Sequence, residues 1–562
     1  MDFANLDTPL FHRAETKAAV SDVCLQNRLV IFAGAGATID KSGLTWRSMI
    51  DALLEPHLDE DQRKSCLKML DPKMAGTVAH ELYLSGVTAR STDSDMIGAQ
   101  LSAKLYKPGT WQHGRLGASI ADFVKIWVKS STDERPRSVC VATTNYDDYL
   151  YSDLVESLGV TDDGSESPEV RVRFPTKVDV LDRSNDLDSV HRSAIVSKWV
   201  DDRRPMPRDS REGEAIDFHF LHGRIPLVRN ASKGKRRIPV VSEIDYIRTR
   251  KWTVEALTKL YSSASVVLVG SGMDDPPQLE ALANTLDISK ENNLRRWAIM
   301  TAPTGSAKER QEYCELISLR LGAFGVDPIF IDYHVQAVQL FRELGLCATK
   351  KTPQLYAQSV GSKCRYGSRV MRWWEDWRSR AAKFGLADHQ FLSHTILFGS
   401  IPTLRTILGA TASETLKVEV WLRWDPSKRR MRLWASSVAD WKNLASMREV
   451  SIAGSNQDPC SEAFREGRPQ FGTFTDSRWL SQIAAPIWLP YGKSEMVVGT
   501  VLIGSTSRPV VSSIGAGKNS ASIVRAISFA EALGLAIAAP GSDELLKHLE
   551  MMAALGLLDA AY

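Results

Sequence analysis

Residues 30–38 read Val-Ile-Phe-Ala-Gly-Ala-Gly-Ala-Thr, an apolar run that leads directly into a Gly-x-Gly turn. The apolar residues predict a short strand that is buried on both faces. Gly34 and Gly36 would let the backbone bend tightly and approach a pyrophosphate, and a following helix would offer N–H groups and the positive end of its dipole. Alone, such a turn is a weak indication, because tight turns without a ligand are more common and the third glycine of the usual fingerprint is missing.

The same succession of a short apolar run, a turn and a helical stretch is repeated as far as Asp332. It is typical of a parallel sheet whose strands are connected by helices. The candidate strands are residues 29–33, 138–142, 218–221, 265–269, 297–300 and 328–331. We therefore predict that residues 1–350 form an α/β domain with a Rossmann-like, doubly wound parallel sheet.

Three further turns carry polar or glycine residues directly after a candidate strand. They read Thr143-Thr144-Asn145-Tyr146-Asp147, His222-Gly223 and Gly270-Ser271-Gly272. The carboxyl ends of strands in an open parallel sheet converge on one crevice, so we expect all four turns to meet over a single ligand.

These four motifs, in this order and spacing, resemble those of the sirtuin-like family, in particular its bacterial defence branch, over about residues 20–340. The resemblance implies that the site binds NAD. The cofactor-binding residues that it implies are Gly34, Ala35, Gly36, Thr38, Thr144, Gly270 and Ser271, the last beside the adenosine ribose. The catalytic residues that it implies are Asn145, Asp147 and His222, around the nicotinamide ribose.

These roles also make chemical sense without the family. Cleavage of the N-glycosidic bond of NAD expels nicotinamide from a ribosyl centre with cationic character, so the site must hold the ring in a dry pocket and guide a nucleophile. Asn145 could orient water or the carboxamide, and the ordinary pKa of a histidine suits His222 for proton transfer near neutral pH. The alternatives are that His222 is a hydrogen-bonded structural histidine and that Asn145 caps a turn.

The chain departs from the protein deacylases of this family. Those enzymes carry a zinc module with paired C-x-x-C motifs, whereas none of the seven cysteines here forms such a pair, so we predict no metal. The departure favours an NAD hydrolase that produces ADP-ribose and nicotinamide, held inactive until infection triggers it. The alternatives are an NAD-dependent deacylase or ADP-ribosyltransferase, and a sensor that only binds NAD or an ADP-ribose derivative.

A different pattern begins after Lys350. Residues 351–387 read as a helical linker in which Trp373, Trp374 and Trp377 recur at helical spacing, which favours packing between domains. Residues 417–424 alternate apolar and polar positions and predict a half-buried strand, paired with residues 430–434. A second hairpin over 483–489 and 496–504 and long helices over 390–408 and 522–538 complete an α+β domain over 388–562.

The order helix, hairpin, helix, hairpin, helix in this second domain resembles a GAF-type sensor domain. The resemblance implies a small-ligand sensor or a dimerisation module, and it leaves the ligand open. A homo-oligomer or regulation by a partner is therefore expected.

Composition adds limits on partners and location. The 562 residues carry a net charge of +3, so only a local patch could attract a polyanion. Residues 161–237 read as a charged insertion, and residues 224–251 hold nine Lys or Arg against two acidic residues, which leaves a nucleic-acid partner possible. Scattered cysteines, the lack of a signal sequence and the interruption of the apolar stretch 523–540 by Arg525 and Glu531 favour a cytoplasmic protein without a membrane span.

Overall fold

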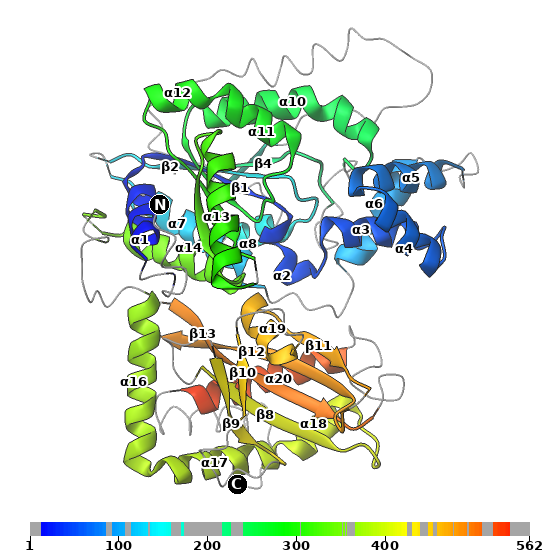
Figure 1. The fold of residues 1–562 in the computed structure, drawn as a ribbon, viewed down its shortest axis with the longest axis vertical. Helices are drawn as coiled ribbons and strands as arrows, with labels where there is room; N and C mark the ends of the chain where they lie inside the picture. The colour runs from blue at the N-terminus through cyan, green and yellow to red at the C-terminus, as the bar shows by residue number, and fades with distance from the viewer. Residues whose placement is uncertain are drawn as a thin grey trace.

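The computed structural model of the protein shows two units, a parallel α/β unit and an antiparallel one, stacked along the long axis of the molecule (Figure 1). The residues that it describes are 10, 13–85, 93–106, 114–132, 135–158, 170–173, 216–225, 240–303, 305–350, 352–354, 356, 366–423, 430–438, 448–452, 458–475, 477–491, 494–507 and 521–539. Most of the charged insertion over 161–237, and residues 226–239 of the basic segment, lie outside these ranges.

The first unit contains a seven-stranded sheet with the order β3-β4-β2-β1-β5-β6-β7, and every neighbouring pair is parallel. All six strands predicted from the sequence are present, which confirms the parallel sheet. The strands are β1 (Arg28–Ala33), β2 (Ser138–Thr143), β3 (Val170–Arg173), β4 (Ile216–Phe220), β5 (Ser265–Val269), β6 (Arg296–Thr301) and β7 (Asp327–Ile331). The edge strand β3, inside the charged insertion, was not among the predicted strands.

Each central strand is apolar because both of its faces are covered. Along β1, Leu29, Ile31 and Ala33 belong to one hydrophobic core, whereas Val30 and Phe32 belong to another. Side chains of a strand point alternately to opposite faces, so the continuous apolar run follows directly from the two helical layers.

The helices divide between these two cores. One face of the sheet is covered by α1 (Ala14–Leu25), α7 (Leu116–Lys129), α8 (Tyr149–Leu158) and α14 (Val335–Ala348). The other face is covered by α10 (Glu243–Tyr261), α11 (Pro276–Asn284) and α13 (Ala307–Gly322), with α12 (Leu286–Glu291) following α11.

A helical module inserted between β1 and β2 lies at the edge of this unit (Figure 1). It consists of α3 (Trp46–Leu54), α4 (Glu60–Met69), α5 (Pro72–Ser85) and α6 (Asp93–Leu105). Its hydrophobic core includes Tyr146 and Tyr149, which follow β2. The module therefore packs directly on the loop that carries the predicted catalytic residues.

The second unit is built on a six-stranded antiparallel sheet with the order β10-β9-β8-β13-β12-β11. Both predicted hairpins, β8–β9 and β12–β13, are confirmed. The strands are β8 (Leu416–Leu422), β9 (Arg430–Ser436), β10 (Glu449–Ser451), β11 (Gln470–Thr473), β12 (Ser481–Tyr491) and β13 (Ser494–Ser505).

Helices cover both faces of the antiparallel sheet. The short α19 (Pro459–Glu466) packs on β12 and β13 from one side, and α20 (Ala521–Ala538) packs on the same strands. A Cβ at Gly534 of α20 would lie 2.5 Å from Val501, whereas Cys460 of α19 lies beside Thr500. Because neighbouring residues of a strand point to opposite faces, the two helices lie on opposite faces of the sheet. Among the described residues, α20 alone is long and apolar enough to cross a membrane, yet 56% of it is buried inside this unit.

Three expectations for this unit need correction. The strand predicted to be half-buried, β8, is buried along its whole length, because its polar face is covered as well. The single helix expected over 390–408 is two helices, α17 (Leu386–Gly399) and α18 (Ile401–Leu408), which meet at Ser400 just before Pro402. The tryptophans of α16 (Tyr366–Phe384) pack inside the second unit, since Trp373 and Trp377 donate hydrogen bonds to carbonyls at the end of α20.

Candidate functional site

The four turns singled out from the sequence lie at the carboxyl end of the parallel sheet. In the sheet order, β1 lies between β2 and β5, and the chain turns to opposite sides of β1 at this point. Such a reversal leaves a crevice between neighbouring loops, where ligands of open parallel sheets bind. The turn after β1 is therefore flanked by the turns that carry Asn145 and Ser271.

Glycines on two of these turns bring the backbones into direct contact. Gly34 donates to the carbonyl of Val269 at 2.8 Å, and Gly36 donates to that of Gly270 at 2.8 Å. A Cβ at Gly34 would lie 2.5 Å from the Gly270 oxygen, and a Cβ at Gly270 would lie 2.3 Å from the nitrogen of Ala37. Gly270 also has a φ of +65°, which favours glycine. These glycines thus join the two loops.

This contact changes one expectation from the sequence. The segment after the turn is a single 3₁₀ turn, Ala35–Ala37, followed by the four-residue α2 (Ile39–Ser42), which ends at Gly43. The amides of Gly34 and Gly36 are bonded to protein carbonyls, so neither can bind a pyrophosphate as it stands. A helix offering free N–H groups was expected after this turn, and the structure has only the 3₁₀ turn and the four-residue α2 there.

Thr38, Asn145 and Asp147 form one hydrogen-bonded group. The Thr38 hydroxyl donates to Oδ2 of Asp147 at 2.8 Å, so its oxygen accepts from Nδ2 of Asn145 at 3.0 Å. Thr143 fixes the backbone beneath them, because its hydroxyl accepts from the Asn145 amide and donates to the Ala33 carbonyl. The group therefore links the turn after β1 to the turn after β2.

The Oδ1 atom of Asn145 differs from the other polar side-chain atoms of this group in its hydrogen bonding. It is buried and has no hydrogen-bond partner among the described residues. Since Nδ2 is committed to Thr38, Oδ1 must face away from that contact. A buried acceptor without a partner is costly in a folded protein, so this oxygen is placed to receive a hydrogen bond from a ligand or water.

Asp147 is buried in surroundings that disfavour the negative charge of its carboxylate. Burial raises the pKa of its carboxyl to about 6, although hydrogen bonds from Thr38 and from the Tyr149 amide lower it. The second carboxylate oxygen accepts from this amide at 3.1 Å. Asp147 thus remains mostly ionised at neutral pH and anchors Thr38.

His222 follows β4 and is fully enclosed. Its Nε2 is buried and has no partner within the described part of the chain. Burial lowers the pKa of His222 to about 3, and the positive charge of Lys73 contributes. The expectation that this histidine titrates near neutral pH is therefore wrong, because desolvation disfavours the imidazolium. His222 is neutral and presents Nε2 as an acceptor or donor, depending on its tautomer.

The helical module and α10 contribute residues that the sequence patterns did not indicate. The ring of Tyr246, in the first turn of α10, meets His222 edge to face at 5.2 Å between centroids. Lys73 of α5 lies with Nζ 4.4 Å from the centre of the Tyr246 ring. Neither residue belongs to a motif next to a strand, so only the folded chain reveals that they surround His222.

The remaining predicted residues lie on the turns that follow β1, β2 and β5. The Ser271 hydroxyl donates to Gln278 of α11 at 2.9 Å and accepts from the Met273 amide, which orders the turn after β5. Ala35 and Thr144 are partly exposed at the ends of β1 and β2. In the described ranges, no group of three or more His, Cys, Asp or Glu side chains could hold a metal ion.

One family model matches part of the first domain. Residues 139–322 match the family model described as a SIR2-like domain, which covers the turns with Asn145, His222 and Ser271 but not the Gly34 turn. The sequence matches no curated protein. SIR2-like domains use NAD, and a parallel sheet of this kind is consistent with their fold. Residues 139–322 of the chain are thus similar to a SIR2-like, NAD-using domain.

Proposed function

We propose that the first domain hydrolyses NAD⁺ to ADP-ribose and nicotinamide. One observation carries the proposal: two buried polar atoms without partners among the described residues, Oδ1 of Asn145 and Nε2 of His222, follow neighbouring strands. Both follow strands at the end of the sheet where the glycine turns meet. Such a pair suits a site that must hold a ribose and a water molecule away from bulk solvent.

The chemistry needs few protein groups. The bond between C1′ of the ribose and the nicotinamide nitrogen breaks, and its electron pair neutralises the pyridinium. A water oxygen then bonds to C1′ and loses one proton to solvent or to a nearby base. Oδ1 of Asn145 can accept a hydrogen bond from the attacking water and orient it. Neutral His222 can accept a hydrogen bond from the ribose or water at Nε2.

Electrostatics in the site agree with these roles. The transition state carries positive charge on the ribose, so a neutral histidine is better tolerated there than an imidazolium. The ionised Asp147 adds favourable negative charge through a buried carboxylate whose position Thr38 fixes. The expected hydrolase thus depends on a preorganised polar group rather than on a strong base.

The assay separates catalysis from binding. Purified wild type, Asn145→Ala and His222→Gln are incubated with NAD⁺, and nicotinamide and ADP-ribose are quantified. We expect equal release of both products by wild type and a loss of about 100-fold or more in Asn145→Ala. Asn292→Ala is the matched control, because Asn292 is exposed and bonds only its own helix in the contacts described, and it should retain full activity.

Other outcomes would indicate other activities. Nicotinamide release without matching ADP-ribose, together with a modified protein, would favour a deacylase or ADP-ribosyltransferase. Binding of ADP-ribose without turnover in any condition would favour a sensor. A continued lack of turnover when extract from phage-infected bacteria is added would contradict the hydrolase.

We further propose that the second domain is a GAF-like sensor or assembly domain that controls this activity in antiviral defence, in the bacterial cytoplasm. Its support is the resemblance of its order of helices and hairpins to that of GAF-type domains, together with a buried polar face on β8. Lys417 and Glu419 form an ion pair at 3.0 Å with almost no exposure, and Oε2 of Glu419 and Nε1 of Trp421 have no partner among the described residues. Polar atoms that remain unsatisfied in this way suit a small ligand with donors and acceptors.

Regulation by assembly and regulation by a ligand predict different results for the activity and for the melting temperature. Assembly would make the specific activity rise with protein concentration, and light scattering would show a larger species. A small ligand would shift the melting temperature of wild type but not of Lys417→Met. A nucleic-acid activator, suggested by the basic segment, would instead bind in a strongly salt-dependent manner.

A further inference from the structure

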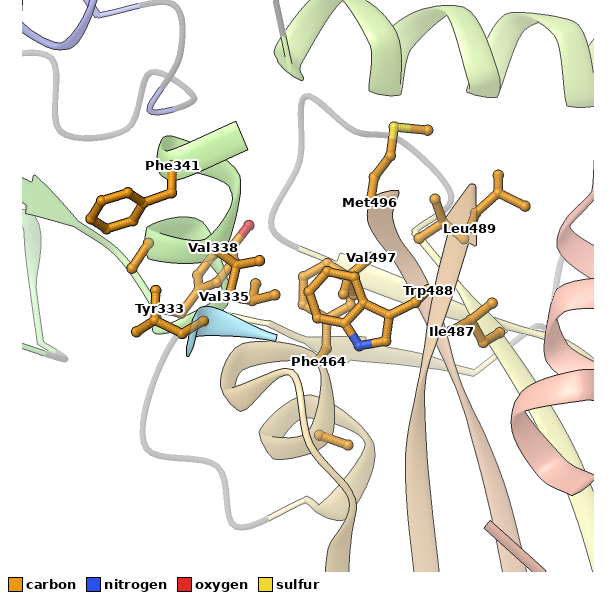
Figure 2. Packing of buried hydrophobic residues seen from close by; sticks show 14 of the residues in the cluster. Tyr333, Val335, Val338, Phe341, Phe464, Ile487, Trp488, Leu489, Met496 and Val497 are labelled. Atoms are coloured by element: carbon orange, nitrogen blue, oxygen red, sulfur yellow. The ribbon is translucent and has the colours of Figure 1, made fainter. Parts of the chain in front are cut away.

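The two domains share one hydrophobic core. A single cluster of buried apolar residues runs from the α1, α7 and α14 layer of the first domain into both faces of the second. Figure 2 shows the junction, where Val335 and Tyr333 at the start of α14 face Phe464 and Trp488 of the second domain. The ring centroids of Tyr333 and Phe464 lie 5.8 Å apart.

This junction has the properties of a domain interior. Val335 and Phe464 are 1% and 0% exposed, and a Cβ at Gly467 would lie 3.0 Å from Trp488 and 3.1 Å from Val335. Domains joined by small polar contacts move relative to each other by default, whereas a dry and close-packed contact holds them together. The second domain is therefore packed rigidly against the first at this point.

A first path leads from the junction towards the site. The guanidinium of Arg115 lies 5.7 Å from the ring centre of Trp488. Arg115 directly precedes α7, and the next amide, that of Leu116, donates to Oδ2 of Asp40 at 2.9 Å. Asp40 is a buried residue of α2. The position of Arg115 on Trp488 thus sets where Asp40 is held.

A second path reaches the other end of the same short helix. Arg468, directly after the C-cap residue Gly467 of α19, extends to Gly43, where a Cβ would lie 3.1 Å from its Nη1. Gly43 ends α2 with a φ of +66°. The second domain therefore contacts the end of α2 directly and its middle through Arg115 and Asp40.

Thr38 is the N-cap of α2 and accepts backbone hydrogen bonds from Lys41 and Ser42. Because the helix has only four residues, a displacement at either end moves Thr38, which holds both Asn145 and Asp147. We infer that Trp488 and Arg468 of the second domain are positioning residues for the active site, acting through α2 and Thr38. This inference rests on the proposed hydrolase.

The test uses the full chain. Trp488→Ala, Trp488→Phe, Arg468→Ala and the control Arg430→Ala are compared for kcat and KM with NAD⁺, and for amide hydrogen exchange over residues 34–43. Arg430 is exposed and pairs with Glu449 within the second domain, away from the junction. Arg468→Ala removes less packing than Trp488→Ala and serves where the larger change prevents folding.

We expect kcat to fall about tenfold in Trp488→Ala and in Arg468→Ala with KM within twofold, because small misplacements of catalytic groups slow the reaction more than binding. Exchange over 34–43 should accelerate in both variants, remain unchanged in β6, and return towards wild type in Trp488→Phe. Wild-type kcat and exchange in folded Trp488→Ala and Arg468→Ala would overturn the inference. If wild type hydrolyses no NAD⁺, the proposed function fails, and exchange alone decides the positioning role: unchanged exchange overturns it.

Discussion

The two sheets of this protein bury polar side chains in different places. In the parallel sheet the central strand β1 is apolar on both faces, and buried polar side chains gather near strand ends and in the turns that follow, as Thr143 ends β2 and Asn145 follows it. In the antiparallel sheet the polar groups lie within a strand, as Lys417 and Glu419 do in β8, and they are almost as inaccessible as the apolar residues between them.

The two sheets differ in how well the sequence pattern predicts which side chains are buried. Alternation along β8 correctly separates an apolar face from a polar one, but it does not reveal that a helix and loops cover the polar face. In the parallel sheet, a continuous apolar run requires cover on both sides, so burial follows from the sequence itself. Burial of a polar face depends on partners far away in the chain, and each buried polar group then needs compensation.

The largest expected loss of stability follows from breaking the buried ion pair of Lys417 and Glu419. Glu419→Gln leaves the Lys417 ammonium buried, and the free energy of unfolding should fall by about 3–5 kcal/mol. The pKa of Lys417 is already lowered by burial and is raised by Glu419, so the variant should lower it further. Denaturant unfolding checks this, with Glu449→Gln as control, because Glu449 lies in more exposed pairs and should cost about 1 kcal/mol or less. Equal losses in the two variants would show that β8 is accessible.

A somewhat smaller loss is expected where the two glycine turns meet. Gly270→Ala forces a side chain into a left-handed conformation and against the backbone at Ala37, so stability should fall by about 2–4 kcal/mol. Gly98→Ala in α6 is the control, since a Cβ there would meet nothing within 4 Å. It should stabilise the protein by about 0.5–1 kcal/mol. A tolerated Gly270→Ala would mean that the turns do not touch.

The site should also give a characteristic dependence of stability on pH. The pKa of Asp147 is raised to about 6, so the folded state retains a proton that the unfolded state loses, and this contribution to stability is lost as pH rises towards 6. The pKa of His222 is lowered to about 3, so its contribution has the opposite sign and is lost as pH falls below 6.5. Asp147→Asn should therefore make stability rise more steeply between pH 4 and 6 than in wild type, by roughly 1–3 kcal/mol over that range.

His222→Gln should have the reverse effect in the same unfolding experiments. NMR of His222 in wild type should show no titration between pH 5 and 8. A pKa near 6.5 for this histidine would contradict the enclosed, neutral state described above.

The smallest expected effect is at a helix cap next to the site. The Ser242 hydroxyl accepts from the amide of Asp245, and the Asp245 carboxylate accepts from the Ser242 amide, so the two form a capping box for α10. Ser242→Ala should cost about 1 kcal/mol and loosen the turn that carries Tyr246. The equivalent cap of α13, at Ser306, lies away from His222. Ser306→Ala should cost a similar amount of stability without any effect on NAD⁺ turnover.

Much of the first domain followed from the sequence because its signals are local. A strand such as β5 is an apolar run next to a glycine turn, and the rule that ligands bind at strand ends then brought Asn145, His222 and Ser271 to one edge. The surroundings of His222 could not be foreseen, since its ring meets Tyr246 of α10, and Lys73, about 150 residues before His222 in the chain, lies over the Tyr246 ring. The pKa of His222 was misjudged for the same reason, because burial by distant segments sets it.

The junction between the domains shows the same limit. Trp488 lies in a strand that the sequence predicted, yet nothing in its neighbours indicates that it meets Arg115 of the other domain. Likewise, the tryptophans of α16 were expected between the domains and instead pack inside the second. Patterns along the chain identify which apolar residues are buried, whereas the identity of the partner is a property of the folded molecule.

The central claim is that water captures the ribose of NAD⁺ at the site around Asn145. The most direct test is a short incubation of wild type and Asn145→Ala with NAD⁺ in oxygen-18 water, followed by mass spectrometry of the ADP-ribose. We predict one labelled oxygen in the product from wild type, above the slow exchange measured with added ADP-ribose, and almost no product from Asn145→Ala. Unlabelled ADP-ribose, or equal product from both proteins, would contradict the account.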